Sequence, residues 1–223
     1  MKSNIKLLYI FAIILLANTY TKAQFNAGET FLQGSLNANK SFNDVGFNNG
    51  RYSGSIDWGK YVSKNSANIL SLTVSYEGVN FDSQVYKNNV FRVGLAKGHE
   101  YYKPIFGKFG MYGRIMGGVN YSNAANGINY GNGGVIKSNE SSDHTIGVNL
   151  FGNGGLMYRL SDKWAFSGQL FNLNVASLGY NWKDEQRIPT QGATATSTKN
   201  QFSYNFSPNI SFSFGVGIRY ILK

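Results

Sequence analysis

The chain has 223 residues, of which only 14% are charged and none is cysteine, and its formal net charge is +10. The lack of cysteine excludes a disulfide framework, and the abundance of Gly, Tyr, Phe, Asn and Ser favours strands and polar loops over helices. The positive charge suits anionic lipid headgroups, but it comes with no nucleic-acid-binding motif, so no nucleic-acid partner is expected.

The amino-terminal segment has the pattern of a secretory signal peptide. An apolar run, Leu7–Ala17, follows two lysines, and Thr21–Ala23 supplies small residues before a cleavage site. The apolar run is too short to cross a bilayer as a helix. We therefore expect residues 1–23 to be removed and residues 24–223 to form one exported domain, with no further domain after the last strand.

From Thr30 onward, eight segments alternate apolar and polar side chains, which is the period of a β-strand. In chain order they are Thr30–Ala38, Ser53–Ser63, Ala67–Val79, Asn89–Tyr102, Phe109–Tyr121, His144–Leu160, Trp164–Tyr180 and Asn209–Leu222. The last is the clearest, because every second residue from Ile210 to Leu222 is apolar. The alternation loses its phase near Asn172, where we predict a β-bulge.

Short and long connections alternate between these segments. The short ones are Lys64–Ser66, Lys103–Lys108 and Ser161–Lys163, and the long ones are Asn39–Tyr52, Asn80–Asn88, Ser122–Ser142 and Asn181–Ser207. Outer-membrane barrels alternate short periplasmic turns with longer extracellular loops. The sequence therefore predicts an all-β fold, an eight-stranded antiparallel up-and-down transmembrane β-barrel, which we expect to be monomeric and surrounded by outer-membrane lipid.

Aromatic residues on the apolar faces gather towards both ends of the predicted strands. Near the short connections lie Tyr101, Phe109, Tyr158, Trp164 and Tyr220, and near the long ones lie Tyr76, Tyr121 and Tyr180. Two such belts are expected where a barrel crosses the headgroup regions of a bilayer. We therefore predict that these eight residues form two aromatic girdles.

Five segments resemble a known family in their strand-and-turn sequences: Gly28–Leu36, Gly59–Asn65, Phe91–Pro104, Tyr158–Ala165 and Phe214–Tyr220. They are similar to the small outer-membrane β-barrel domain family, the OmpA/OmpX-like type of the porin superfamily. The resemblance implies location in the outer membrane of a Gram-negative bacterium and no shared catalytic residues. Members often end on an aromatic residue, whereas this chain ends on Lys223, so its assembly signal departs from the pattern.

Seven charged residues fall on the polar faces of the predicted strands and so point into the lumen: Asp57, Glu77, Arg92, Glu100, Arg114, Arg159 and Arg219. The interior of an eight-stranded barrel is only wide enough for side chains to fill, and buried charges are tolerated only when paired. Glu77 and Arg92 lie at similar heights and are the expected ion pair. The predicted polar network either fills the lumen permanently and stabilises the barrel, or it is the gate of a narrow channel.

Signals of catalysis are weak. Glu140, Ser142 and His144 share one face where a strand begins, yet a catalytic arrangement needs the imidazole beside the hydroxyl and an acid to orient it. With two histidines and no cysteine, a transition-metal site is not expected. The glycine-rich segment Gly127–Gly134 lacks the Lys-Ser/Thr of a phosphate-binding loop. We therefore predict no catalytic residue, no cofactor and no metal.

The sequence thus favours a non-enzymatic outer-membrane barrel with a structural or surface-interaction role. Binding usually resides in the surface loops of a rigid scaffold, so any surface ligand is expected at Ser122–Ser142 or Asn181–Ser207. Two alternatives remain open: a narrow, low-conductance porin for small solutes, and a soluble exported barrel that binds a small ligand.

Overall fold

The computed structural model describes residues 25–43, 47–81, 86–132, 135–187 and 195–222. The predicted signal peptide lies outside them. The strands are β1 (Thr30–Asn43), β2 (Phe47–Ser63), β3 (Ser66–Phe81), β4 (Tyr86–Phe106), β5 (Phe109–Asn132), β6 (Val135–Arg159), β7 (Trp164–Arg187), β8 (Ala195–Asn205) and β9 (Asn209–Leu222). Among the described residues, no helix is long and apolar enough to cross a membrane.

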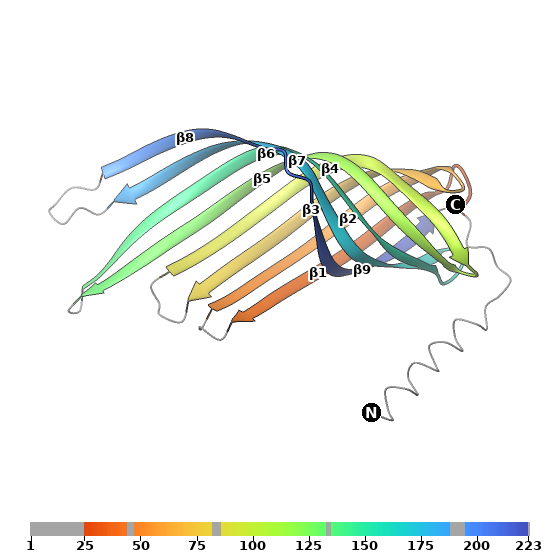
Figure 1. Cartoon of the computed structure of the whole chain (residues 1–223), viewed down its shortest axis with the longest axis horizontal. Coiled ribbons are helices and arrows are strands. Elements are labelled where there is room, and N and C mark those ends of the chain that lie inside the picture. The colour runs from red at the N-terminus through yellow and green to blue at the C-terminus, as the bar shows by residue number, and fades with distance from the viewer. Residues whose placement is uncertain (1–24, 44–46, 82–85, 133–134, 188–194, 223) are drawn as a thin grey trace, which may run out of the picture.

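The strands form one antiparallel sheet that closes on itself (Figure 1). Each strand from β1 to β7 pairs with the next along the chain, and β9 pairs with both β7 and β1. The ring therefore contains eight strands, β1 to β7 and β9, as the alternation of apolar and polar residues predicted. We call the end with the short turns proximal and the opposite end distal.

The ninth strand, β8, is the distal continuation of β9. It pairs with β7 from Ser177 to Arg187, whereas β9 pairs with β7 from Trp164 to Asn174. The two pieces are interrupted at residues 206–208, where Pro208 has no N–H to donate to a ladder. The expectation of a long loop over Asn181–Ser207 is therefore wrong in part, because most of its described residues are paired strand.

The predicted loop Ser122–Ser142 is likewise largely strand. Strands β5 and β6 continue beyond the apolar region and stay paired as far as Asn132 and Val135. This extension is rich in Ser, Asn and Gly. A strand with water on both faces needs no apolar side, so the alternation disappears while the backbone pairing continues. The other two connections are likewise shorter than predicted, because β1 and β2 reach Asn43 and Phe47, and β3 and β4 reach Phe81 and Tyr86.

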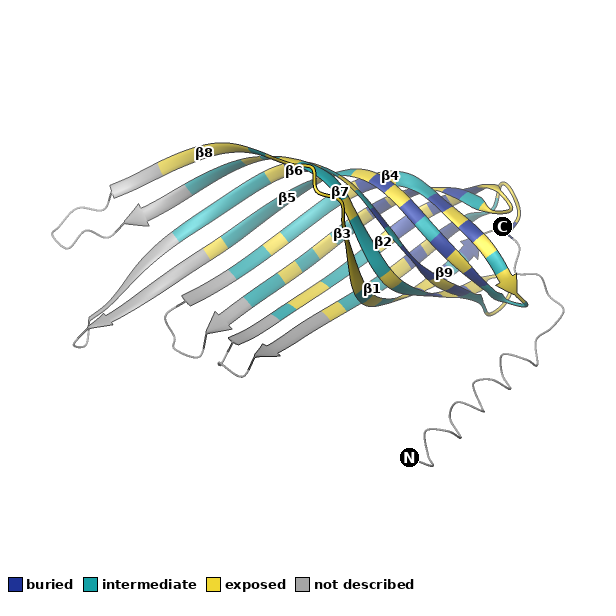
Figure 2. Cartoon of the chain, in the orientation of Figure 1, coloured by how far each residue is buried: buried dark blue, intermediate teal, exposed yellow. Residues whose placement is uncertain are grey.

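The alternation of faces agrees with the sequence analysis in the proximal half (Figure 2). Outward apolar residues such as Ile56, Leu72 and Ile115 are 47–57% exposed, while their inward neighbours are buried or half-buried. The register of β7 shifts at Leu170 and again at Val175, which confirms the bulge predicted near Asn172. One short turn is tighter than predicted, because β4 runs to Phe106 and leaves Gly107, with φ of 51°, in the turn.

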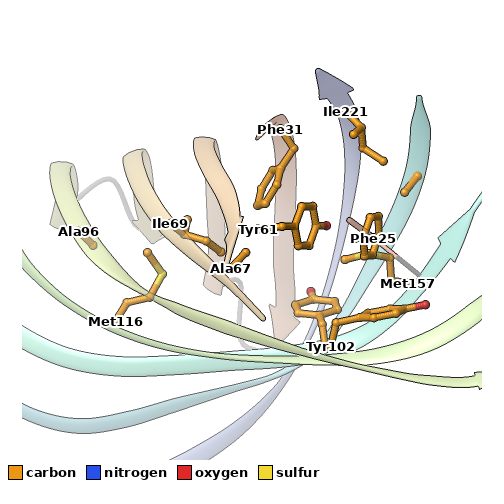
Figure 3. Close-up of a cluster of buried hydrophobic side chains, with 12 residues drawn as sticks. Phe25, Phe31, Tyr61, Ala67, Ile69, Ala96, Tyr102, Met116, Met157 and Ile221 are labelled. Carbon is orange, nitrogen blue, oxygen red and sulfur yellow. The ribbon is translucent and has the colours of Figure 1, made fainter. Parts of the chain in front are cut away.

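The apolar core lies inside the proximal half of the barrel (Figure 3). It consists of side chains that the inward faces of the strands and the amino-terminal turn contribute: Phe25, Phe31, Tyr61, Ala67, Ile69, Ala96, Tyr102, Tyr112, Met116, Met157, Ala165 and Ile221. We call this cluster the plug. It fills the barrel interior near the short turns, as expected for an eight-stranded ring.

Candidate functional site

Four charged side chains cross the lumen just distal to most of the plug, with Ala96 and Met116 on their distal side. Asp57 of β2, Glu100 of β4, Arg114 of β5 and Arg219 of β9 are at most 7% exposed. The group, which we call the charged layer, holds two positive and two negative charges. Its charges therefore balance, which is the condition for ionised groups to be tolerated inside a protein.

Arg219 is the most extensively bonded member of the charged layer. Its Nη1 and Nη2 donate to the two carboxylate oxygens of Glu100, at 2.8 and 2.7 Å, a bidentate geometry that suits the planar guanidinium. Its Nε donates to Oε1 of Gln33 at 2.9 Å, and Nη1 also donates to the hydroxyl of Tyr61. Gln33 in turn donates to Oγ of Ser167 at 3.2 Å, so the bonding extends to β7.

Arg114 joins the two carboxylates of the charged layer. Its Nε donates to Glu100 at 2.8 Å, its Nη1 to Asp57 at 2.7 Å and its Nη2 to Gln33 at 3.1 Å. Asp57 also accepts from the hydroxyl of Ser71 at 2.6 Å. Each of the four charges therefore has at least two hydrogen bonds, and the network links β1, β2, β3, β4, β5 and β9 across the lumen.

The plug seals the lumen proximal to the charged layer. The ring of Phe25 stacks on Tyr61 with centroids 4.3 Å apart and meets Tyr102 edge-on at 5.1 Å. The guanidinium of Arg219 lies 3.8 Å from the centre of the Phe31 ring, a cation–π contact that ties the two layers together. Figure 3 shows Phe25 and Tyr61 facing one another inside the barrel.

A turn before β1 carries Phe25 into the barrel. The N–H of Gly28 donates to the carbonyl of Tyr61, and the N–H of Tyr61 donates to the carbonyl of Glu29, both at 2.8 Å. Gly28 has φ of 94°, a left-handed conformation that favours glycine. Sequence reasoning missed Phe25, because one aromatic residue ahead of the first strand has no periodicity to reveal where it points.

The other three predicted lumen residues lie apart from the charged layer. Glu77 and Arg92 form the expected ion pair at 2.9 Å on the distal side, where their side chains are 24% and 34% exposed. Arg159 lies at the proximal end, where it donates to the carbonyls of Ser161 and Asp162. The structure therefore divides the seven predicted residues into a central layer of four, a distal pair and a proximal arginine.

The predicted girdle residues lie at the two ends of the outward apolar surface. On the proximal side, Phe109 contacts Tyr158 and Trp164 contacts Tyr220, with centroids 4.6 and 4.7 Å apart, and Tyr101 is 60% exposed. On the distal side, the three tyrosines project from β3, β5 and β7: Tyr76, Tyr121 and Tyr180.

His144 has neighbours that differ from those of a catalytic base. Its Nδ1 is 2.8 Å from the hydroxyl of Tyr121, and its ring stacks on Trp182 with centroids 5.2 Å apart. These contacts leave the imidazole facing aromatic groups, and the side chain of Glu140 lies outside the described part of the structure. Within that part, no group of three His, Cys, Asp or Glu could hold a metal ion.

Distal to the charged layer, the lumen contains a cavity of about 830 Å³. Its lining is mostly Ser, Thr, Asn and Gln, and lining residues such as Ser55, Ser75 and Asn120 are partly exposed to solvent. Asp57 and Arg114 form part of its floor. The interior therefore contains a polar cavity on the distal side of the charged layer and a closed apolar plug on its proximal side.

Comparison with solved structures finds similar chains among bacterial outer-membrane and surface proteins. A major outer membrane protein from Thermus thermophilus is similar with a TM-score of 0.50 at 11% identity, over 87% of this chain and 99% of that one. The TM-score with OprG from Pseudomonas aeruginosa is 0.45 at 14% identity, over 89% of this chain and 99% of that one. The TM-score with Neisserial surface protein A is 0.38 at 14% identity, over 86% of this chain and 96% of that one.

No protein-family model and no curated protein matches the sequence. The closed ring of eight antiparallel strands and the Thermus structure that covers most of both chains nevertheless agree on the architecture. The chain therefore has the fold of the small outer-membrane β-barrel proteins.

Proposed function

We propose that this chain is an integral protein of the Gram-negative outer membrane, without catalytic activity, that serves as a closed scaffold for surface-exposed hairpins. One observation carries the proposal: the proximal lumen is filled by a charge-balanced, fully hydrogen-bonded layer resting on an aromatic plug. A barrel filled in this way has no continuous water path along its axis. Such a barrel can hold its strands rigidly and present the hairpins at its distal end.

The outward surface supports the membrane location. Large apolar side chains on every strand of the ring are exposed, including Leu36, Trp58, Leu95 and Ile218, at 48–71%. In water, so large an apolar surface would drive association, whereas lipid chains satisfy it. This favours an integral membrane protein over a soluble exported barrel. Recovery of the folded protein from membranes without detergent would contradict the proposal.

The narrow porin is the second candidate, because a polar cavity and the Glu77–Arg92 pair lie in the distal lumen. Planar-bilayer recording separates the two functions. We expect the wild-type protein to show no discrete openings. Openings whose conductance changes in an Arg92→Ala variant would support the porin and contradict the closed scaffold.

We further propose that any surface partner binds the two hairpins that extend beyond the apolar surface, β5–β6 and β7–β8. They contain most of Ser122–Ser142 and Asn181–Ser207 and are rich in hydroxyl and amide groups. Protease treatment of intact cells tests their location. We expect cuts only within these hairpins and the other distal connections, and cuts at the short turns, such as Ser161–Lys163, would reverse the proposed orientation.

A further inference from the structure

Distal to residue 37, the barrel wall is not closed between β1 and β9. Their ladder runs from Thr30 and Leu222 to Asn37 and Gly215 and stops. Within the described part of the chain, residues 38–43 pair only with β2, residues 209–212 pair only with β7, and Ser213 and Phe214 fall in a register shift of the β7–β9 ladder. We call this unpaired stretch the seam. In Figure 1, β1 and β8 lie at opposite edges of the distal half of the sheet.

The seam lies within the apolar outer surface. Phe212 and Phe214, on the β9 side of the seam, are 86% and 81% exposed, compared with 45% for Phe166, whose strand is paired on both sides. The seam would therefore be in contact with lipid. Unpaired backbone N–H and C=O groups facing hydrocarbon are strongly unfavourable, so a polar headgroup, with the water it brings, is favoured at this part of the wall.

Two cavities of opposite character meet at the seam. Inside is the polar lumen cavity described above, and outside is an apolar groove of about 710 Å³. Side chains of Leu36, Leu170, Phe214 and Val216 contribute to the groove wall. Asn37 and Gly215, the last paired residues, line both cavities. A molecule at the seam can therefore have one end in each.

The polar side of the seam suits a single negative charge. Gln169 donates to Asn172 and to Ser213 at 3.0 and 2.9 Å, so the wall there is neutral and hydrogen-bonding. Arg51 also lines the cavity and lies opposite Glu77 in the β2–β3 ladder, but Glu77 forms its ion pair with Arg92. Arg51, Arg92 and Glu77 together therefore carry one excess positive charge, and Arg51 lies on the strand next to β1.

We propose that the seam binds a single-chain carboxylate amphiphile, a long-chain fatty acid, with its carboxylate in the lumen cavity towards Arg51 and its alkyl chain in the outer groove. The proposal rests on the membrane location argued above. The charged layer closes the cavity on the proximal side, so the site exchanges its ligand with the bilayer and the distal lumen, and not along the barrel axis.

A diazirine-bearing laurate tests the site in vesicles of dimyristoylphosphatidylcholine, with adducts mapped by mass spectrometry. We expect adducts on both sides of the seam. Gly168 lines the groove, and a Cβ added there meets no atom within 4 Å. Gly168→Leu fills the groove without a clash, and by displacing one or two methylenes it should lower labelling roughly tenfold. Gly117→Leu on β5, equally free of contacts, is the matched control and should leave labelling unchanged.

The charge is tested by competition between laurate and dodecanol, which share a chain length. We expect laurate to compete with the probe roughly tenfold better, through one charge-assisted contact. Arg51→Gln should remove this preference, whereas Lys60→Gln, a cation on the outward face of the same strand, should keep it. Equal competition in the wild-type protein, or adducts spread evenly around the barrel, would overturn the proposal.

A second measurement reports on the β1–β9 ladder itself and does not score ligand binding. The chain has no cysteine, so Ala38→Cys with Phe214→Cys reports whether the ladder continues beyond Asn37 and Gly215. Leu36→Cys with Val216→Cys, which are paired, should form a disulfide within one chain. We expect no such disulfide at 38 and 214 with laurate present. A disulfide within the chain would show a closed ladder, and one between chains a second copy at the seam; either would overturn the proposal.

Membrane insertion is scored separately, from the change in gel mobility on boiling. A wild-type protein that fails to insert contradicts the proposed function. A protein that inserts but takes up no label at the seam contradicts only the fatty-acid site.

Discussion

The proximal and distal halves of this barrel are built from the same eight strands but are held together differently. In the proximal half, strands pair all round the ring, and the interior is filled by the plug and the charged layer. In the distal half, β1 and β9 separate, the interior is a polar cavity, and the β5–β6 hairpin continues beyond its neighbours as a two-stranded ladder. Stability should therefore reside in the proximal half, and binding in the distal half.

The largest effect is expected from the charged layer. Arg219→Met would leave Glu100 buried with Arg114 as its remaining cation, and removing one partner of a buried pair costs about 3–5 kcal/mol. Unfolding by urea from lipid vesicles measures the change in free energy. Arg92→Met, at the partly exposed distal pair, is the control and should cost less than about 1 kcal/mol. Equal losses would remove the distinction between the halves.

The plug should give the next largest effect. Phe25→Ala empties a fully buried position stacked on Tyr61, and such truncations cost about 3 kcal/mol. Phe206→Ala, between β8 and β9 at a side chain that is 77% exposed, should change the free energy of unfolding by about 0.5 kcal/mol. If Phe25→Ala unfolds like the wild-type protein, the amino-terminal turn does not close the barrel.

Two tyrosines in the plug separate hydrogen bonding from packing. The hydroxyl of Tyr61 accepts from Arg219, whereas the hydroxyl of Tyr102 is buried without a hydrogen-bond partner among the described residues. Tyr61→Phe should destabilise the protein by about 1–3 kcal/mol, and Tyr102→Phe should be neutral or slightly stabilising. The reverse order in urea unfolding would show that the charged layer does not depend on Tyr61.

The smallest effect is expected in the distal hairpins. Replacing residues 127–139 with a two-residue turn shortens β5 and β6 where, among the described residues and apart from Gly127 and Ile128 against β4, these strands pair only with each other. The free energy of unfolding should change by less than about 1 kcal/mol, because such peripheral ladders open far below global unfolding. A larger loss would mean that the extended ladder helps to hold the barrel together.

The sequence was most informative where lipid and lumen impose opposite demands on alternate residues. The eight strands, the bulge near Asn172 and the inward charges all follow from that alternation. The alternation no longer identifies strands beyond Tyr121 and Tyr180, because both faces of a strand meet water there and polar residues suit either face. There, segments that read as loops are strands, and β8 was not predicted.

The interior could be predicted in composition but not in arrangement. Parity placed Glu100, Arg114 and Arg219 in the lumen, but which of them meet depends on the stagger between neighbouring strands, which no single strand encodes. Phe25 and the seam were invisible for a related reason. One lies before any periodic segment, and the other depends on where β1 and β9 cease to pair.

Cysteine accessibility tests the central claim, that the lumen is open distally and sealed proximally. Ser55 lines the polar cavity, and Ala165 is buried within the plug. In oriented vesicles, a membrane-impermeant maleimide should label Ser55→Cys from the distal side only and Ala165→Cys from neither side. Labelling of Ser55→Cys from the proximal side at a comparable rate would show a continuous aqueous path and contradict the account.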